Sequence, residues 1–359
     1  MSRNAQLYVI LLHHICWLCG LFLPFHTRAQ SQAGHLPVLP EIDKPPARVV
    51  IVHDPEATDA FQPRTEKILD MINLGLTTLT GKLNPSDAWR SLLSTQDLIG
   101  IKVYSSPGPD SGTRPAVVAG VVEGLLKAKI PPRNIIVWDK QLEDLRRSGF
   151  LELGAHYAVR VEASSVSGYD ENTFYSPDEP ILGRLVWGDL EFGRKGEGLG
   201  RKSFVSKLVS KGMTKIINIT PLLNHYRAGV SGNLYSLTTG SVDNTLRFET
   251  EPDRLAKAVP EIYALPALGD RVILNIVDAL TCQYEGEHSI RLHASATLNE
   301  LRFSADPVAL DVLSLQELNR QRQLARVPAT TNRFELFSIA SELELGVSDP
   351  SRIRVERVN

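Results

Sequence analysis

The sequence predicts an α/β fold: a mixed, mainly parallel sheet with flanking helices and an irregular insertion around residues 164–205. The strongest observation is the segment 97–139. It contains a strand to Val103, a Gly- and Pro-rich loop, a helix from Pro115 to about Lys127, and a strand ending at Asp139. This βαβ pattern indicates neighbouring parallel strands. Further β-branched runs, separated by helical segments, indicate that the sheet extends beyond this unit.

The remaining elements follow in order along the chain. The run "ARVVIVHD" predicts a first strand, and apolar residues at helical spacing predict a helix over residues 65–80. "NPSDAWRSLL" begins another helix, capped by Asn84 or Ser86. Residues 157–163, 214–220 and "DRVILNIVDAL" predict strands, the last ending at Asp278. A helix after Pro307, a helix near residues 333–344 and a short strand "RIRVERV" complete the chain.

The N-terminus has the pattern of a secretory signal peptide. Arg3 precedes the apolar run "LYVILLHHICWLCGLFLPF", and "TRA" places small residues before a cleavage site after Ala29. No Arg-Arg pair precedes the run, which favours the general secretory route over the twin-arginine route. We expect a signal peptide over residues 1–29, a Pro-rich linker over 30–46 and a single α/β domain over 47–359. The alternative is an uncleaved anchor.

Composition narrows the classes of partner and cofactor. Loss of Arg3 and Arg28 with the signal peptide leaves 37 basic and 41 acidic residues, a net charge of −4, so nucleic acid is not an expected partner. We expect a periplasmic or extracellular protein that binds a small molecule and has no stable membrane span after cleavage. Cys282 is the one cysteine left, so neither an internal disulfide nor an iron–sulfur cluster of its own is expected.

Four polar side chains lie in or at the end of predicted strands. They are Lys102, Asp139, Asn218 and Asp278. Open parallel sheets bind ligands beyond the carboxyl ends of their strands, so in a common sheet these side chains would converge on one crevice. The alternative is that each merely caps a turn.

The segment 216–245 predicts a strand that enters a long polar loop containing His225 and Arg227. Long loops in compact domains are often functional, and His225 would serve there as a proton carrier or metal ligand, or else be structural. Downstream, "DALTCQYEGEHS" brings Asp278, Glu285, Glu287 and His288 together without an established metal spacing. The segment "GRKGEGLGRK" matches neither the dinucleotide-binding fingerprint nor the spacing of a Walker phosphate loop. We interpret it as a surface loop.

The helix that begins at Pro307 raises a question about a buried charge. Asp306 precedes the proline and is a natural N-cap. Asp311, however, lies in the same apolar stripe as Val308 and Leu315, and a carboxylate removed from water needs a partner. We predict that Lys102 pairs with Asp311 beside the crevice. The pair is then either part of the site or only part of the scaffold.

Five segments in order resemble the domain of unknown function 362 family. They are "IGIKVY", "NIIVWD", "IINITPLLNHYRAGVSG", "NIVDALTCQYEG" and "FSADPVALDVLSL" with "ELGVSDPSRIRVERV" behind it, which together cover roughly residues 95–358. The resemblance implies an α/β protein of a family in which some members are exported and some carry ferredoxin-like iron–sulfur segments. The positions that match the polar pattern of the family are Lys102, Asp139, His225, Asp278, Glu285, Asp306 and Asp311.

The chain also departs from the family pattern. Leu223 stands where the family usually has a lysine, and Tyr235 and Ser236 stand where it has a Lys-Asn pair. The resemblance therefore puts activity toward an anionic ligand in doubt for this protein.

These observations support two hypotheses of different classes. The first is an exported enzyme that acts on a small polar substrate, with Lys102, His225, Asp306 and Asp311 as catalytic residues, with or without a divalent metal. The ligand-binding residues would be Asp139, Asn218, Arg227, Asp278 and Glu285. The second is a non-catalytic periplasmic binding protein. An accessory subunit of a redox system is a third interpretation, suggested by the iron–sulfur associations of the family.

Overall fold

A nine-stranded sheet organises the chain, with strand order β15-β1-β14-β13-β11-β4-β5-β6 and β12 beside β11. The computed structural model describes residues 45–194, 198–287, 290–328 and 334–359. Strands β13, β11, β4, β5 and β6 are parallel to one another, and β1 is parallel to β15. Only β14 and the short β12 form antiparallel pairs in the described part of this sheet. The predicted fold class, mixed and mainly parallel, is confirmed.

The N-terminal half of the described chain contains the predicted βαβ unit. Its elements are β1 (Ala47–His53), β2 (Thr58–Asp59), β3 (Gln62–Pro63), α1 (Thr65–Thr80), α2 (Pro85–Leu92), β4 (Ile99–Val103), α3 (Pro115–Lys127), β5 (Ile135–Asp139), α4 (Leu142–Arg147), α5 (Phe150–Tyr157) and β6 (Arg160–Ala163). Asn84 caps α2, because its side-chain oxygen accepts from the Asp87 N–H. Of the two predicted caps, the structure therefore selects Asn84.

The insertion and the C-terminal half follow. The insertion contains α6 (Ser164–Ser167), β7 (Tyr169–Tyr175), β8 (Gly183–Arg184), β9 (Leu199–Gly200) and β10 (Ser203–Ser206). Strand β7 pairs with β10, and β8 pairs with β9, in two small sheets. The remaining elements are β11 (Lys215–His225), β12 (Gly229–Val230), α7 (Asn233–Ser241), α8 (Leu246–Glu249), α9 (Pro252–Tyr263), β13 (Val272–Gln283), β14 (Ser295–Ser304), α10 (Pro307–Leu324), α11 (Phe334–Glu342) and β15 (Ile353–Val358).

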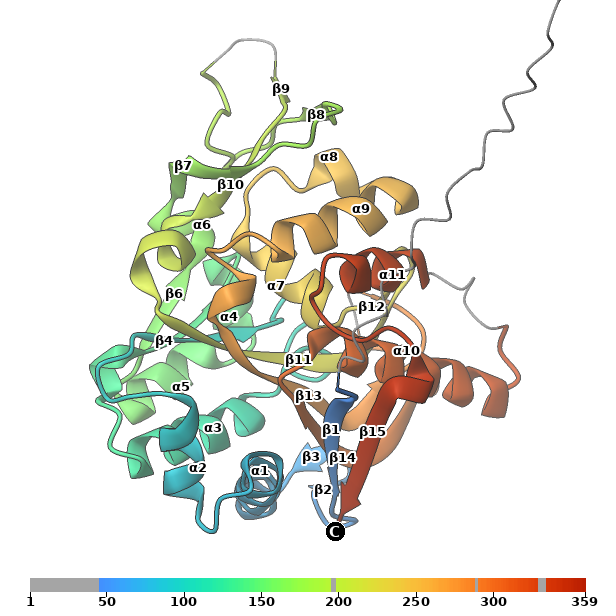
Figure 1. Cartoon of the computed structure of the whole chain (residues 1–359). Helices are drawn as coiled ribbons and strands as arrows, with labels where there is room; N and C mark the ends of the chain where they lie inside the picture. The colour runs from blue at the N-terminus through green and yellow to red at the C-terminus, as the bar shows by residue number, and fades with distance from the viewer. Residues whose placement is uncertain (1–44, 195–197, 288–289, 329–333) are drawn as a thin grey trace, which may run out of the picture. The chain divides into compact units, whose positions relative to one another are not determined.

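Two helical layers cover the two faces of the sheet (Figure 1). Helices α1, α2, α3 and α5 pack on one face through an aliphatic core that includes Ile101, Val121 and Ile219. Helices α7 to α11 pack on the other face, where the core includes Trp138 and Leu237. Alternating residues of each strand face opposite layers. The two layers therefore receive different side chains from the same strands.

The predicted long loop over residues 216–245 is wrong. Strand β11 continues to His225, and residues 233–241 form α7, a helix in which every residue is buried. Helices are recognised in sequences by an apolar stripe opposite a polar, solvated face. Helix α7 has no solvated face and its sequence, "NLYSLTTGS", is largely polar, so that signal is missing. Strand β13 likewise runs past its predicted end at Asp278 to Gln283.

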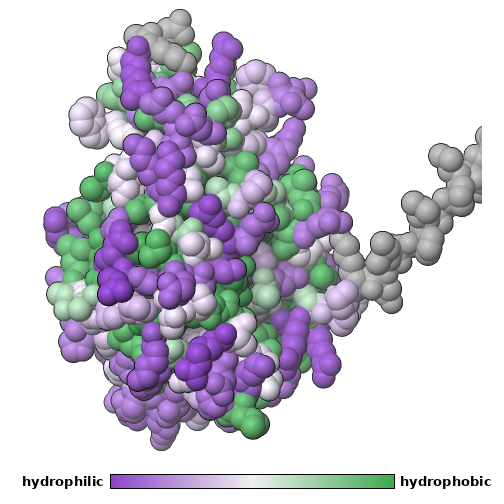
Figure 2. Space-filling view, turned by 60° about the vertical axis from the view of Figure 1, so that its left-hand side comes forward, coloured by the Kyte–Doolittle hydropathy of each residue, from purple (hydrophilic) through white to green (hydrophobic). Residues whose placement is uncertain are grey.

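Several expectations fall outside the described residues. The signal peptide over residues 1–29 and nearly all of the linker over 30–46 lie there, and so does His288. Within the described residues, no helix is both long and apolar enough to cross a membrane. The face drawn in Figure 2 mixes hydrophilic residues with smaller hydrophobic areas.

Candidate functional site

A row of buried polar residues crosses the sheet on the side of α7. Lys102 of β4 lies opposite Asn218 of β11, and Asn218 lies opposite Asn275 of β13. All three are completely buried, whereas their strand neighbours Ile101 and Ile219 face the aliphatic layer. Buried polar groups reduce stability unless they are hydrogen-bonded. The polar row is therefore a costly feature, restricted to one face.

Lys102 forms a buried ion pair with Asp139. Its Nζ lies 2.9 Å from Asp139 Oδ1 and donates to the Val103 carbonyl oxygen at 2.5 Å and to Ser236 Oγ at 3.2 Å. The other carboxylate oxygen of Asp139 accepts from the N–H and hydroxyl of Ser105, at 2.8 and 2.7 Å. Burial lowers the pKa of Lys102, and Asp139 opposes that shift. These contacts explain how a lysine is tolerated inside a strand.

The predicted Lys102–Asp311 pair is wrong. Asp311 Oδ1 accepts from the backbone N–H and side-chain amide of Asn233, at 2.7 and 2.8 Å, and Oδ2 accepts from the Leu234 N–H at 3.0 Å. Asp311 therefore satisfies the free N–H groups at the start of α7. Burial raises its pKa to about 6, while these hydrogen bonds oppose the shift. A carboxylate within an apolar stripe did need a partner, and the partner is a helix N-terminus.

Asp306 is the predicted N-cap, but it lies away from the other site residues. Its carboxylate accepts from Ala309 N–H at 2.8 Å and from Val347 N–H at 2.9 Å. It follows β14, three strands from β4, and lines a different cavity together with Arg48. Burial raises the pKa of Asp306, with the backbone donors opposing. The expected grouping of Asp306 with Lys102 and His225 is not formed.

Asp278 and Glu285 also lie apart from that group. Asp278 faces the start of α3 on the opposite side of the sheet, where Oδ1 pairs with Arg114 Nη1 at 2.9 Å and Oδ2 accepts the Arg114 N–H at 3.1 Å. The expected convergence of four strand-end side chains therefore includes Lys102, Asp139 and Asn218 but not Asp278. Glu285 is half-buried and interacts electrostatically with Arg322 of α10.

A cavity of about 450 Å³ opens beyond the carboxyl ends of β4, β5 and β11, and we call it the α7 cavity. Of the site residues predicted from the sequence, Asp139, His225 and Arg227 line it, and so does Glu287, which was noted there beside Glu285. The other lining residues are Tyr104, Ser106, Lys140, Gln141, Asp144, Tyr235, Thr239, Gly240, Thr245, Leu246, Glu249, Thr250 and Glu287. Its position agrees with the rule that open parallel sheets bind ligands at this edge.

The imidazole of His225 is held by the backbone of the turn that follows it. His225 Nδ1 accepts from the Ala228 N–H at 2.9 Å and from the Arg227 N–H at 3.3 Å. Nδ1 therefore carries the lone pair, and the neutral ring carries its proton on Nε2. Glu287 Oε1 lies 3.9 Å from Nδ1, too far for a hydrogen bond, and instead accepts from the Tyr226 N–H. Thus the ring offers an N–H donor rather than a base.

Two tyrosines form an aromatic wall with this histidine. The rings of His225 and Tyr235 are 4.2 Å apart between centroids, and Tyr104 packs edge-on against Tyr235 at 6.4 Å. Tyr235 Oη donates to Glu249 Oε1 at 3.0 Å. Burial raises the pKa of both tyrosines, so both hydroxyls are neutral at physiological pH. The wall combines apolar ring faces with neutral hydrogen-bonding groups.

The charges in and behind the cavity wall are balanced. Lys140 Nζ donates to the Asp243 carbonyl oxygen at 3.0 Å and to Thr245 Oγ1 at 3.2 Å, and burial lowers its pKa. Arg227 is exposed at the edge. Of the lining carboxylates, Asp139 pairs with Lys102 and Asp144 pairs with Arg147, both cations lying behind the wall. The remaining charged lining residues are Glu249, Glu287, Lys140 and Arg227, which sum to zero net charge. The cavity therefore has no strong preference for an ion of either sign.

Sequence reasoning missed much of this wall. Tyr235 was noted only as a departure from the family pattern, and Tyr104, Lys140 and Glu249 were not identified. Tyr104 and Lys140 each directly follow a predicted strand, so the strand-end rule, applied one residue further, would have found them. Glu249 lies on α8, and nothing in the sequence indicates that α8 reaches this cavity.

The described residues contain no group of three or more His, Cys, Asp or Glu side chains placed to hold a metal ion. Cys282 is buried, and burial raises the pKa of its thiol to about 12. The side chains that face the α7 cavity are instead hydrogen-bond donors and acceptors.

Three comparisons place the chain among known proteins. The family model described as "Domain of unknown function (DUF362)" matches residues 98–316. A comparison with curated proteins finds no match. Among solved structures, the chain is similar to a protein from Thermotoga maritima, with 10% identity and a TM-score of 0.40. That alignment covers 75% of this chain and 61% of the other, so this chain spans less than two thirds of that protein.

Proposed function

We propose that this chain, which belongs to the domain of unknown function 362 family, binds a small polar molecule in the α7 cavity. The supporting observation is the wall formed by His225 and Tyr104 at strand ends and by Tyr235 of α7, whose hydroxyl donates to the carboxylate of Glu249. Ring faces with donors and acceptors at their edges suit a molecule with several hydroxyl or amino groups. Balanced charge favours a neutral or zwitterionic ligand over a strong anion.

His225 is the residue through which this site would also support catalysis. Its Nδ1 is occupied by backbone N–H groups, so its contribution to a reaction is the Nε2–H donor, which polarises an oxygen atom of the ligand. Lys102 is fully buried and bound to Asp139, Val103 and Ser236, so we assign it to the scaffold of the site. This proposal replaces the earlier set of catalytic residues, in which Lys102, Asp306 and Asp311 accompanied His225.

The proposal is tested by two substitutions of His225. In His225→Asn, the amide oxygen takes the place of Nδ1 and keeps the acceptor for the Ala228 N–H but removes the donor. In His225→Gln, the longer side chain returns a polar group near the position of Nε2. Both are screened against monosaccharides, polyols, sugar acids and amino acids by thermal shift and titration calorimetry.

We expect a ligand that binds the wild-type protein to bind His225→Asn about tenfold more weakly. In His225→Gln, we expect the affinity to recover. Equal affinity in wild type and His225→Asn would contradict the proposal.

A divalent cation in the α7 cavity is the second candidate, because Asp139, Glu249 and Glu287 line the cavity together with His225. It predicts a stoichiometric metal in protein purified without a chelator, lost in His225→Asn. Elemental analysis of both proteins decides between the two. We further propose export, with cleavage after Ala29; the mass of the mature chain would then place its first residue at Gln30.

A further inference from the structure

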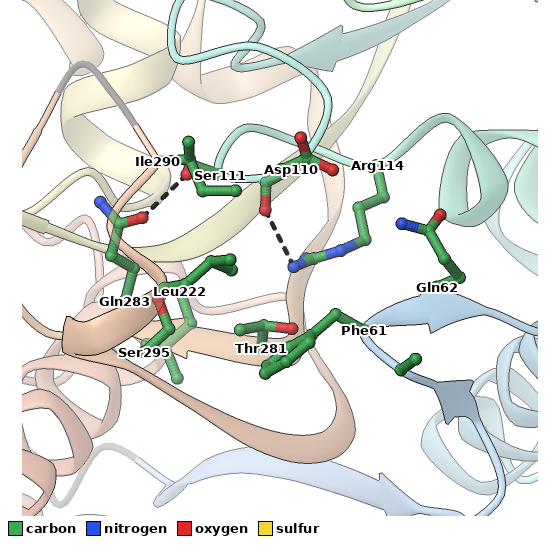
Figure 3. Close-up of a pocket in the computed structure, with 12 residues that line it drawn as sticks. Phe61, Gln62, Asp110, Ser111, Arg114, Leu222, Thr281, Gln283, Ile290 and Ser295 are labelled. Atoms are coloured by element: carbon green, nitrogen blue, oxygen red, sulfur yellow. Dashed lines mark hydrogen bonds between the residues drawn. The ribbon is translucent and has the colours of Figure 1, made fainter.

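A second cavity, of about 240 Å³, lies at the start of α3, and we call it the α3 cavity (Figure 3). Figure 3 shows Phe61 and Gln62 from the β2–β3 hairpin, Arg114 at the start of α3, and Thr281 and Gln283 from the end of β13, arranged around one space. The other lining residues are Ala60, Asp110, Ser111, Leu222, Ile290, Leu292 and Ser295. None of these residues lines the α7 cavity.

Thr281 lines this cavity, and its buried hydroxyl has no hydrogen-bond partner among the described residues. The residue is 9% exposed. A buried hydroxyl that lacks a partner destabilises the folded state, so valine, which has the same shape, would serve the fold better. A hydroxyl that brings no benefit to the fold points to a ligand as its partner.

Arg114 reaches the same space with its charge already balanced. Its Nη1 lies 2.9 Å from Asp278 Oδ1, and its Nη2 donates to the Asp110 carbonyl oxygen at 3.1 Å. The guanidinium carries more N–H donors than these bonds use. Since Asp278 is fully buried beside Arg114, the pair presents donors without net positive charge. This arrangement suits an uncharged oxygen acceptor better than an anion.

The hairpin over the cavity has a tight two-residue turn. Ala60 and Phe61, which form the turn between β2 and β3, have φ values of 48° and 68°. Positive φ at both residues is the usual geometry of a two-residue hairpin, although glycine and asparagine adopt it most readily. It places the Phe61 ring, which is 43% exposed, at the cavity. The turn therefore supplies an apolar ring to one side of the cavity.

We propose that the α3 cavity is a second binding site, for a small uncharged molecule with a carbonyl or hydroxyl oxygen and a short apolar chain. The oxygen accepts from Arg114 and Thr281, and the apolar chain packs against Phe61, Leu222 and Leu292. The site does not depend on the α7 cavity, because the two share no residue.

Butyramide, butyrate and butylamine are matched probes for this site. They share an apolar chain and differ in the charge of the polar group. Saturation-transfer NMR on the mature protein is expected to detect butyramide in preference to the two ions. In Thr281→Val, its affinity is expected to fall about fivefold, while Tyr235→Phe, a change in the α7 cavity, leaves it unchanged.

A second readout addresses the hydroxyl itself. Because this hydroxyl has no partner among the residues that the structure describes, Thr281→Val is expected to raise the melting temperature, by about 1–2 °C. A lower melting temperature would mean that the hydroxyl stabilises the fold, and would overturn the proposal. So would a preference for butyrate, or butyramide binding that is equal in wild type and Thr281→Val.

Discussion

The two faces of the central sheet receive side chains from the same strands but are built on different principles. On the face under α3, β4 contributes Ile101 and β11 contributes Ile219, and the contacts are aliphatic. On the face under α7, the same strands contribute Lys102 and Asn218, each of which needs a specific partner. The aliphatic face needs only shape and volume.

This difference indicates what each face is for. An aliphatic layer on both faces would stabilise the fold at least as well as the polar row does, because buried ion pairs contribute little net stability. The polar face leads to the α7 cavity, through Asp139 at its base and through α7 itself. We therefore interpret the buried polar row as the support that positions the cavity wall.

The largest expected effect comes from removing the cation of the polar face. Lys102→Met leaves the Asp139 carboxylate buried without its partner, so the free energy of unfolding should fall by about 3–5 kcal/mol. The matched change one residue away, Ile101→Val on the aliphatic face, should lower it by about 0.5–1.5 kcal/mol. Urea unfolding measures both. Equal losses would remove the distinction between the faces.

Asp311→Asn is expected to have the next largest effect. The amide has one acceptor oxygen where the carboxylate has two, and its NH₂ group would face the N–H donors of α7. The free energy of unfolding should therefore fall by about 1–3 kcal/mol near neutral pH.

The difference in stability between wild type and Asp311→Asn is expected to depend on pH, with a definite sign. The pKa of Asp311 is about 6 in the folded protein, above its ordinary value of 3.8, so the folded state binds the proton more tightly than the unfolded state. Asp311 therefore makes wild type more stable as pH falls from about 6 to about 4. The asparagine cannot titrate. The stability difference between wild type and Asp311→Asn should widen over this range, and a constant difference would contradict the assignment.

Two Gly→Ala variants, one in the helical layer on each face, test how each face accommodates one added methyl group. In Gly240→Ala on α7, the new Cβ would lie 2.1 Å from Lys102 Cε and 3.1 Å from Asp139 Oδ1. In Gly120→Ala on α3, it would lie 2.5 Å from Ile72 Cδ1, the end of an aliphatic side chain that can rotate away.

We expect Gly240→Ala to lower the free energy of unfolding by about 1–3 kcal/mol. Gly120→Ala should cost less, because the Ile72 side chain can rotate away, whereas Lys102 is held by its ion pair with Asp139. The gain in helix propensity is common to both variants. Thermal unfolding of the two variants tests this order.

The sequence predicted what depends on local signals. The βαβ unit, the Asn84 cap and the Asp306 cap were found because turn, cap and periodicity signals lie within a few residues of each other. The partner of Asp311 was not found. It lies at the start of α7, 78 residues away, and α7 lacks the apolar stripe that would have revealed it.

The site shows the same division. Asp139 was expected at the carboxyl edge of the sheet from the strand-end rule, and His225 and Arg227 were expected in a loop that follows a strand. All three line the α7 cavity. Asp278 was expected among them, yet it faces α3. The sequence indicated that β4 and β5 are parallel neighbours, but it did not predict β14 or the order of the strands. It also did not show which face each residue takes near a register shift, such as the one between Pro221 and Leu222.

The central claim is that the polar face supports a ligand-binding cavity, and titration calorimetry with Tyr235→Phe tests it most directly. The ligand is the strongest hit of the thermal-shift screen, and Ile101→Val serves as the control from the other face. We expect Tyr235→Phe to weaken binding about five- to tenfold and Ile101→Val to leave it unchanged. Unchanged affinity in Tyr235→Phe, or an equal loss in Ile101→Val, would contradict the claim.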